Sequence, residues 1–123
     1  MKVLRILLVE DDTLIGTLLA DILRANGHEI CEVTVTEAAA ISAAREHRPD
    51  LMIVDVGLGT GSGISAMETI LRGGFVPHLY MTGNVARISA LRQHAVVLEK
   101  PFQETALLLA VQCAMDVAAM RRA

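Results

Sequence analysis

The sequence predicts a doubly wound α/β fold, in which a five-stranded parallel sheet lies between two layers of helices. Short aliphatic runs alternate five times with longer segments of helical period. The runs are apolar at successive positions, so both faces of each strand are expected to be buried. Glycine, proline or acidic residues separate the segments. Strands that are buried on both faces and joined by helices are typical of parallel sheets.

The composition is that of one ordinary domain. The chain has 123 residues, of which 53% are hydrophobic and 2% aromatic, so we expect a single aliphatic core. The net charge of -3 gives no sign of a nucleic-acid partner or a polybasic membrane patch. Cys31 and Cys113 lack metal-ligand spacing and are expected to be buried free thiols. Because no apolar stretch approaches the roughly 18 residues of a membrane span, we expect a cytoplasmic protein.

Each expected strand is a short aliphatic run that ends at a turn or a polar residue. The first run ends abruptly in Glu10, Asp11 and Asp12. The third run is the most apolar of the chain and ends at Asp55. The expected strands are Leu4–Val9, His28–Val33, Leu51–Val54, His78–Met81 and Ala95–Leu98.

Helical segments fill the intervals between the strands. The first begins near Thr13, with Asp12 or Thr13 as its N-cap, and ends at Asn26-Gly27, where a left-handed cap is expected. One apolar face of this helix carries Leu14, Leu18, Ile22 and Leu23. The second helix is expected to have Thr36 as its N-cap, with Glu37 behind it, and to continue to about His47. The later helices are expected from Ile64 to Leu71, near Val85–Gln93, and from Phe102 to Met120.

Polar residues capable of phosphoryl chemistry stand at the ends of four strands: Glu10 and Asp11, Asp55, Thr82, and Lys100. In an open parallel sheet, the ligand site lies outside the carboxyl ends of the strands. Carboxylates gathered there repel one another, and Mg²⁺ suits an all-oxygen site of this kind. One carboxylate could then attack phosphorus, while the lysine and the hydroxyl stabilise the phosphoryl oxygens.

Each of these residues also has an ordinary interpretation. The acidic group after the first strand could simply begin a helix, Asp55 could be a turn aspartate, and Lys100-Pro101 is a common type of dipeptide. The signals occur together, each at the end of an expected strand and in the same chain order. Their combination favours a phosphoryl-accepting site.

These motifs resemble those of the receiver domain of two-component response regulators, over essentially the whole chain. The residues that carry the resemblance are Ile6-Leu7-Leu8-Val9-Glu10-Asp11-Asp12, Leu51-Met52-Ile53-Val54-Asp55, Gly63, Thr82 and Lys100-Pro101-Phe102. The resemblance implies a (βα)5 flavodoxin-like three-layer sandwich with strand order 2-1-3-4-5. It also implies one receiver domain over residues 1–123, with no output domain.

The resemblance further implies a role for each site residue. Asp55 would take a phosphoryl group from a histidine kinase or a histidine phosphotransfer protein, assisted by Thr82 and Lys100. Mg²⁺ would be bound by Glu10, Asp11, Asp55 and the backbone carbonyl of Gly57. The Lys100–Pro101 bond would be cis and would aim Lys100 into the site. Such a domain is a signalling receiver that catalyses only its own phosphorylation and dephosphorylation, not a conventional enzyme.

Three features depart from the family's common pattern. Gly59 replaces a proline in a glycine-rich loop, which we expect to be more flexible. Val97 replaces the aromatic residue that often acts as a rotamer switch. The interval from Thr82 to Lys100 is short, so the helix within it should be short or irregular. The segment Tyr80-Met81-Thr82-Gly83-Asn84-Val85 resembles an alphaproteobacterial subgroup without that aromatic.

The expected function is that of a stand-alone regulator, a phosphorelay intermediate or a phosphate sink. Residues 85–93, 95–98 and 102–120 would form the face that binds a downstream protein or a second copy. A Mg²⁺-dependent phosphohydrolase is the rival enzyme class, but it would carry a second aspartate where Gly57 stands. A receiver that has lost phosphorylation is the other rival, and the complete residue set argues against it.

Overall fold

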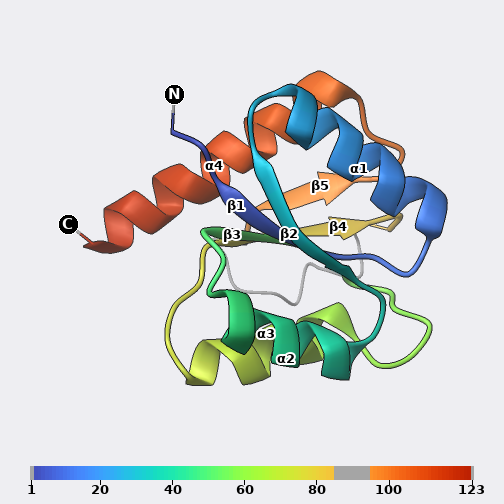
Figure 1. Cartoon of the computed structure of the whole chain (residues 1–123), viewed down its shortest axis with the longest axis vertical. Coiled ribbons are helices and arrows are strands. Elements are labelled where there is room, and N and C mark those ends of the chain that lie inside the picture. The colour runs from blue at the N-terminus through green and yellow to red at the C-terminus, as the bar shows by residue number, and fades with distance from the viewer. Residues whose placement is uncertain (1, 85–94, 123) are drawn as a thin grey trace.

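A computed structural model of the chain describes residues 2–84 and 95–122. Its five parallel strands form one sheet of order β2-β1-β3-β4-β5. Helices α1 and α4 cover one face of this sheet, and α2 and α3 cover the other (Figure 1). The predicted doubly wound architecture and strand order are therefore confirmed.

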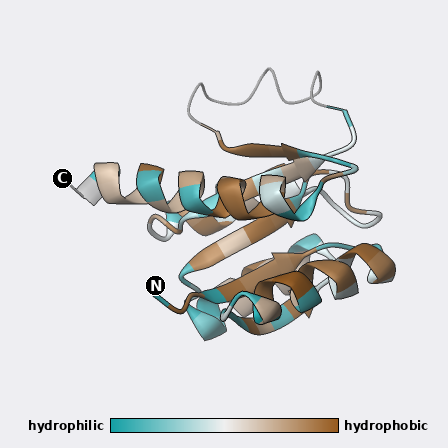
Figure 2. Ribbon diagram, turned by 90° about the horizontal axis from the view of Figure 1, so that it is seen from above, coloured by the Kyte–Doolittle hydropathy of each residue, from teal (hydrophilic) through white to brown (hydrophobic). Residues whose placement is uncertain are grey.

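The strands begin and end within two residues of their predicted positions. They are β1 Arg5–Val9, β2 Glu29–Thr34, β3 Leu51–Asp55, β4 His78–Thr82 and β5 Val97–Glu99. Their residues are mostly hydrophobic, shown in brown in Figure 2, whereas α4 alternates between hydrophobic and hydrophilic residues. This difference follows from position, because the inner strands are covered on both faces and a surface helix on one.

Four helices are described: α1 Thr13–Ala25, α2 Glu37–His47, α3 Gly63–Arg72 and α4 Glu104–Arg122. The helix expected near Val85–Gln93 lies outside the described residues. Helix α4 is therefore the one predicted from Phe102 to Met120. In the part of the chain that the structure describes, no helix combines the length and apolar character needed to cross a membrane.

The core is divided between the two faces of the sheet. In β1, Ile6 and Leu8 face α1 and α4, whereas Leu7 and Val9 face α2 and α3. The first layer is filled by large side chains, and each fully buried leucine or isoleucine contributes about 1.5–3 kcal/mol. The second layer includes three buried alanines of α2 and one of α3: Ala40, Ala43, Ala44 and Ala66.

The apolar face of α1 differs from the sequence interpretation. Leu23 is buried as expected, but Leu14 is 81% exposed and Leu18 is 50% exposed. The buried side of α1 is instead formed by Gly16, Leu19, Ala20 and Leu23. The helix has apolar residues on more than one side, so its periodicity alone did not select the face that packs on the sheet.

The cysteines are free, as predicted, but they are not both buried. Cys31 is half-buried in β2, and Cys113 is exposed on α4. Strand β2 lies at the edge of the sheet, and Cys113 points away from it on the outer side of a surface helix. Their burial depended on the orientation of these two elements, which the sequence did not specify.

Candidate functional site

The carboxyl ends of four neighbouring strands form the candidate site. Glu10 directly follows β1, Asp55 ends β3 and Thr82 ends β4. Lys100 directly follows β5, and its backbone amide donates to the Thr82 carbonyl at 2.8 Å. Because all the strands are parallel, these residues meet at one edge of the sheet. The sequence predicted this convergence from the order of the strands alone.

Three carboxylates gather at this edge. Glu10, Asp11 and Asp55 each offer an oxygen, and these oxygens lie within 4.8 Å of one another. Glu10 is only 1% exposed and Asp55 only 5%, whereas Asp11 is exposed. Two buried acids so close together require a nearby cation or a shared proton.

Lys100 supplies one positive charge to this cluster. Its Nζ lies 2.9 Å from Glu10 Oε1 and 3.1 Å from Asp55 Oδ2. The Lys100–Pro101 peptide bond is cis, as the sequence interpretation expected. The amine therefore bridges the acids that follow β1 and end β3.

The electrostatics show that one lysine does not fully compensate the acids. Burial raises the pKa of Glu10 to about 7; the hydrogen bond with Asp55 also raises it, whereas Lys100 lowers it. For Lys100, burial lowers the pKa, but its contacts with Glu10 and Asp55 outweigh burial, and the net pKa is raised. Near neutral pH, the cluster therefore has room for further positive charge.

This donor set fits a hard divalent cation such as Mg²⁺. The three acids offer only oxygen atoms, and exposed Asp11 leaves the cluster open to water on one side. Mg²⁺ prefers oxygen ligands and keeps several waters. The predicted Mg²⁺ site therefore has its three carboxylates in place.

The contacts of the remaining predicted site residues are as follows. The Thr82 hydroxyl is buried and forms hydrogen bonds with the backbone of Asn84, donating at 3.1 Å and accepting at 3.0 Å. The Gly57 amide donates to Asp55 Oδ1 at 3.2 Å, and the role of the Gly57 carbonyl as a metal ligand stays a prediction. Val97 is half-buried and is paired in register with Tyr80 of β4.

Asp12 caps a helix, which is the ordinary interpretation that the sequence had left open. Its Oδ1 accepts hydrogen bonds from the amides of Leu14 at 2.9 Å and Ile15 at 3.2 Å, which makes it the N-cap of α1. Glu10 and Asp11 face the site instead. The acidic run therefore combines a helix cap with two site carboxylates.

The sequence analysis missed Glu37 as a residue connected with the site. It was expected only to follow the N-cap Thr36, but its carboxylate reaches the loop after Asp55 and binds Ser62 and Ser65. These residues are more than 20 positions away in the chain. No local pattern could have identified the contact.

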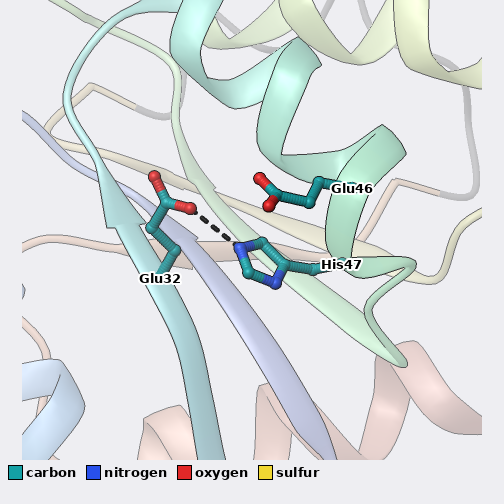
Figure 3. A group of neighbouring side chains, drawn as sticks. All are labelled: Glu32, Glu46 and His47. Atoms are coloured by element: carbon teal, nitrogen blue, oxygen red, sulfur yellow. Dashed lines mark hydrogen bonds and ion pairs between the residues drawn. The ribbon is translucent and has the colours of Figure 1, made fainter.

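A second group of potential ligands lies on the outer side of β2. Figure 3 shows Glu32 of β2 beside Glu46 and His47 of α2, three residues that the sequence spacing did not connect. His47 Nε2 lies 2.8 Å from Glu32 Oε1. Both carboxylates are exposed, and the Arg5 guanidinium donates to the His47 carbonyl at 2.8 Å. The group is best described as a surface contact that joins α2 to the edge strand.

Comparison with known protein families identifies the family to which this chain belongs. The model of the response regulator receiver domain matches residues 6–112, which extend from the second residue of β1 to about the middle of α4. The chain belongs to the response regulator receiver domain family. A receiver domain is a signalling module of two-component systems and not a conventional enzyme. Domains of this family typically bind Mg²⁺ and have a histidine kinase as their general partner.

Two curated relatives illustrate the similarity of this receiver domain to others. It is 32% identical over 116 residues to the transcriptional regulatory protein PdtaR of Mycobacterium tuberculosis, covering 91% of this chain but 57% of PdtaR. It therefore spans little more than half the length of PdtaR. It is also 28% identical over 118 residues to the chemotaxis protein CheY of Bacillus subtilis, covering 87% of this chain and 93% of CheY.

Solved structures give the same architecture for the receiver domain. The solution structure of the PhyR receiver domain from Erythrobacter litoralis superposes with a TM-score of 0.84 at 30% identity, covering 94% of this chain and 92% of that one. NtrX from Brucella abortus superposes with a TM-score of 0.87 at 27% identity, covering 98% of this chain and 28% of NtrX. The similarity to PhyR agrees with the alphaproteobacterial resemblance of the sequence.

Proposed function

We propose that this receiver domain accepts a phosphoryl group on Asp55 from a histidine kinase or a histidine phosphotransfer protein, in a Mg²⁺-dependent reaction. The observation that carries the proposal is the group of Glu10, Asp11 and Asp55, with oxygens within 4.8 Å of one another, bridged by Lys100. Buried carboxylates held this close together cost folding free energy, and a phosphoryl-transfer site accounts for that cost.

The residues divide the chemistry among them. An Asp55 carboxylate oxygen attacks phosphorus, and the bond between phosphorus and the donor's imidazole nitrogen breaks. Lys100 already lies within ion-pair distance of Asp55, so its charge is available to a phosphoryl group on that carboxylate. The Thr82 hydroxyl would have to exchange its contacts with the Asn84 backbone for the phosphoryl oxygens.

Glu10, Asp11, Asp55 and the Gly57 carbonyl would hold the Mg²⁺. When bound, the metal supplies positive charge that neutralises the carboxylates and the phosphoryl oxygens. Asp11 is the exposed member of the group, and Glu10 is the buried one. The residues that would hold the metal therefore include one solvent-facing acid and one buried acid.

The proposal includes a cytoplasmic location, which is usual for this family, and action as a stand-alone regulator, a relay or a phosphate sink. The surface expected for a downstream protein or a second copy includes β5 and α4, and its other expected part, residues 85–93, lies outside the described residues. In the described part of that face, Leu109 of α4 is 66% exposed. An apolar side chain at the outer surface suits contact with another protein.

The test is incubation with a small acyl phosphate and Mg²⁺, followed by intact-mass measurement after an acid quench. We expect the wild-type chain to gain one phosphoryl group, and Asp55→Asn and EDTA-treated samples to gain none. Reduction of the acyl phosphate with borohydride, followed by peptide mapping, would locate the modified residue.

Two outcomes contradict the proposal. Steady turnover of the donor without accumulation, even on the time scale of rapid quenching, would favour a phosphohydrolase. No gain of mass at saturating donor and Mg²⁺ would favour a binding module that has lost phosphorylation.

A further inference from the structure

The loop between β3 and α3, residues 56–62, is held by a glutamate from a different helix. Glu37, the first residue of α2, accepts a hydrogen bond from the Ser62 amide on Oε1 at 2.9 Å. Its Oε2 accepts another from the Ser65 hydroxyl at 2.7 Å. The Glu37 amide donates to the Thr60 carbonyl at 3.3 Å. Glu37 therefore forms hydrogen bonds to this loop and to the first turn of α3 through both of its carboxylate oxygens and its backbone amide.

The charge of Glu37 suits this position. Ser62 is the N-cap of α3, so the carboxylate lies at the end of that helix where the unpaired amides point outward. The Ser65 hydroxyl lowers the pKa of Glu37 most, and the Ser62 amide lowers it further. The side chain is therefore ionised at neutral pH, and each contact to it is a charge-assisted hydrogen bond.

The backbone of the loop passes directly over Glu37. Gly61 has φ of +86°, and a Cβ built there would lie 2.6 Å from Glu37 Cβ and 2.7 Å from Oε1. A side chain at position 61 would therefore push the carboxylate away. The bare backbone of Gly61 allows the close approach on which the Ser62 contact depends.

The other end of the same loop is joined to the site carboxylates. The Gly59 amide donates to Asp11 Oδ2 at 2.6 Å, and the Gly57 amide donates to Asp55 Oδ1 at 3.2 Å. The loop thus connects Glu37 on one side with two acids of the cluster on the other. A glycine-rich loop has many alternative conformations, so its anchors decide which one is populated.

We propose that Glu37 is a positioning residue of the Asp55 site, which holds the loop 56–62 in the conformation that binds Mg²⁺. The inference rests on the function proposed for Asp55, and it gives Glu37 no contact with the phosphoryl group. Removal of the carboxylate frees the loop, so metal binding must then order it again. The affinity for Mg²⁺ falls as a consequence, although Glu10, Asp11 and Asp55 are unchanged.

Calorimetric titration with Mg²⁺ tests this on the wild-type chain and on four variants. Glu37→Ala should bind Mg²⁺ roughly tenfold more weakly. Ser65→Ala removes one of the two side-chain contacts and should give a smaller loss of the same sign. Glu37→Gln keeps the length and one acceptor oxygen, so its affinity should fall between the wild type and Glu37→Ala. Glu104→Ala, an exposed glutamate at the first position of α4, is the matched control and should bind as the wild type.

Hydrogen exchange of the Ser62 amide gives a second readout, which requires neither metal nor phosphate. It should become faster in Glu37→Ala and Ser65→Ala and remain unchanged in Glu104→Ala. If Glu37→Ala lowers only the melting temperature, with unchanged Mg²⁺ affinity and Ser62 exchange, the residue is merely structural and the proposal is wrong. Should Glu37→Ala fail to fold, Ser65→Ala decides the question by the same two measurements.

The two proposals fail in different ways. Asp55 phosphorylation without any effect of Glu37→Ala on Mg²⁺ affinity would overturn the role of Glu37 alone. A wild-type chain that binds Mg²⁺ but takes no phosphoryl group would overturn the proposed function. Weaker Mg²⁺ binding in Glu37→Ala would then still support the role of Glu37 in positioning the loop.

Discussion

Gly63 lies where the neighbouring backbone leaves no space for a side chain. It begins α3, eight residues after Asp55, and its backbone lies against the last residues of β3. A Cβ built there would collide with the carbonyl oxygen of Asp55 and approach Val54 Cγ1 to 2.7 Å. The requirement is for space and not for a positive φ. Gly63 therefore lets α3 start close beside the strand that carries Asp55.

We expect Gly63→Ala to lower the free energy of unfolding by about 1–3 kcal/mol, because backbone must move to admit the methyl group. Chemical denaturation followed by circular dichroism measures the change. Gly57→Ala, in the loop before α3, is the control, since nothing lies within 4 Å of a Cβ there. Equal stability of the two variants would show that the helix moves away from β3 at little cost.

At the scale of elements, α4 is joined to the start of β4 by a cluster of rings and one cation. The His78 and Tyr80 rings pack edge-on, with their centroids 5.3 Å apart. The centroids of the His78 and Phe75 rings are 6.0 Å apart. The Arg121 guanidinium lies 4.2 Å above the Phe75 ring. A cation stacked on an aromatic ring in this way contributes about 0.5–1 kcal/mol at an exposed position.

This cluster predicts a pH dependence of stability. Burial lowers the pKa of His78, the hydrogen bond to the Val76 carbonyl opposes that effect, and the Arg121 charge lowers the pKa further. Above its ordinary pKa of 6.5, the ring is neutral in both the folded and the unfolded state. Below that value, the unfolded chain binds a proton that the folded protein resists, so stability falls as the pH decreases.

In His78→Phe, the free energy of unfolding should therefore decrease less steeply below pH 6.5 than in the wild type. Arg121→Gln should give a smaller change in the same direction, because one cause of the lowered pKa is removed. Urea denaturation over a series of pH values measures both slopes. Parallel curves for the wild type and His78→Phe would contradict the expectation.

At the scale of the whole molecule, the site depends on Lys100, which is 90 residues away from Glu10 in the chain. In the sheet, β3 and β4 lie between β1 and β5, and Lys100 at the end of β5 reaches Glu10 at the end of β1. The Glu10 side chain is fully buried, so its carboxylate depends on Lys100 for compensation when no metal is bound. The ion pair between Lys100 and Glu10 therefore depends on the complete sheet and not on any single segment.

We expect Lys100→Met to lower the free energy of unfolding in EDTA by about 1–3 kcal/mol, because two acids lose their cation. Added Mg²⁺ should restore part of this loss, since it compensates the same carboxylates. Denaturation with and without Mg²⁺ measures both effects. Lys2→Met, at an exposed position, is the control and should behave as the wild type under both conditions. Insensitivity of Lys100→Met to Mg²⁺ would contradict this account.

Much of the fold was predictable because it depends on local pattern and on general rules of topology. Aliphatic runs located the strands, and parallel strands place Glu10, Asp55, Thr82 and Lys100 at one edge of the sheet. The N-cap at Asp12 is equally local. The single-domain organisation without an output domain stays a prediction.

Other features depended on contacts between elements. The buried side of α1 was decided by its packing on the sheet, which left Leu14 exposed. The closeness of Glu32 to His47 arises because α2 lies beside the edge strand. Such contacts depend on the distance and rotation between elements, which no single segment encodes.

The same division applies to the site. The sequence by itself determined which residues end the strands, and therefore which chemistry can gather at the carboxyl edge. Only the tertiary structure decided how the loop after Asp55 is held, because Glu37 reaches Ser62 across 25 positions of the chain. A strand end is a local property of the sequence, whereas an anchor between a helix and a loop exists only when both have packed against the same sheet.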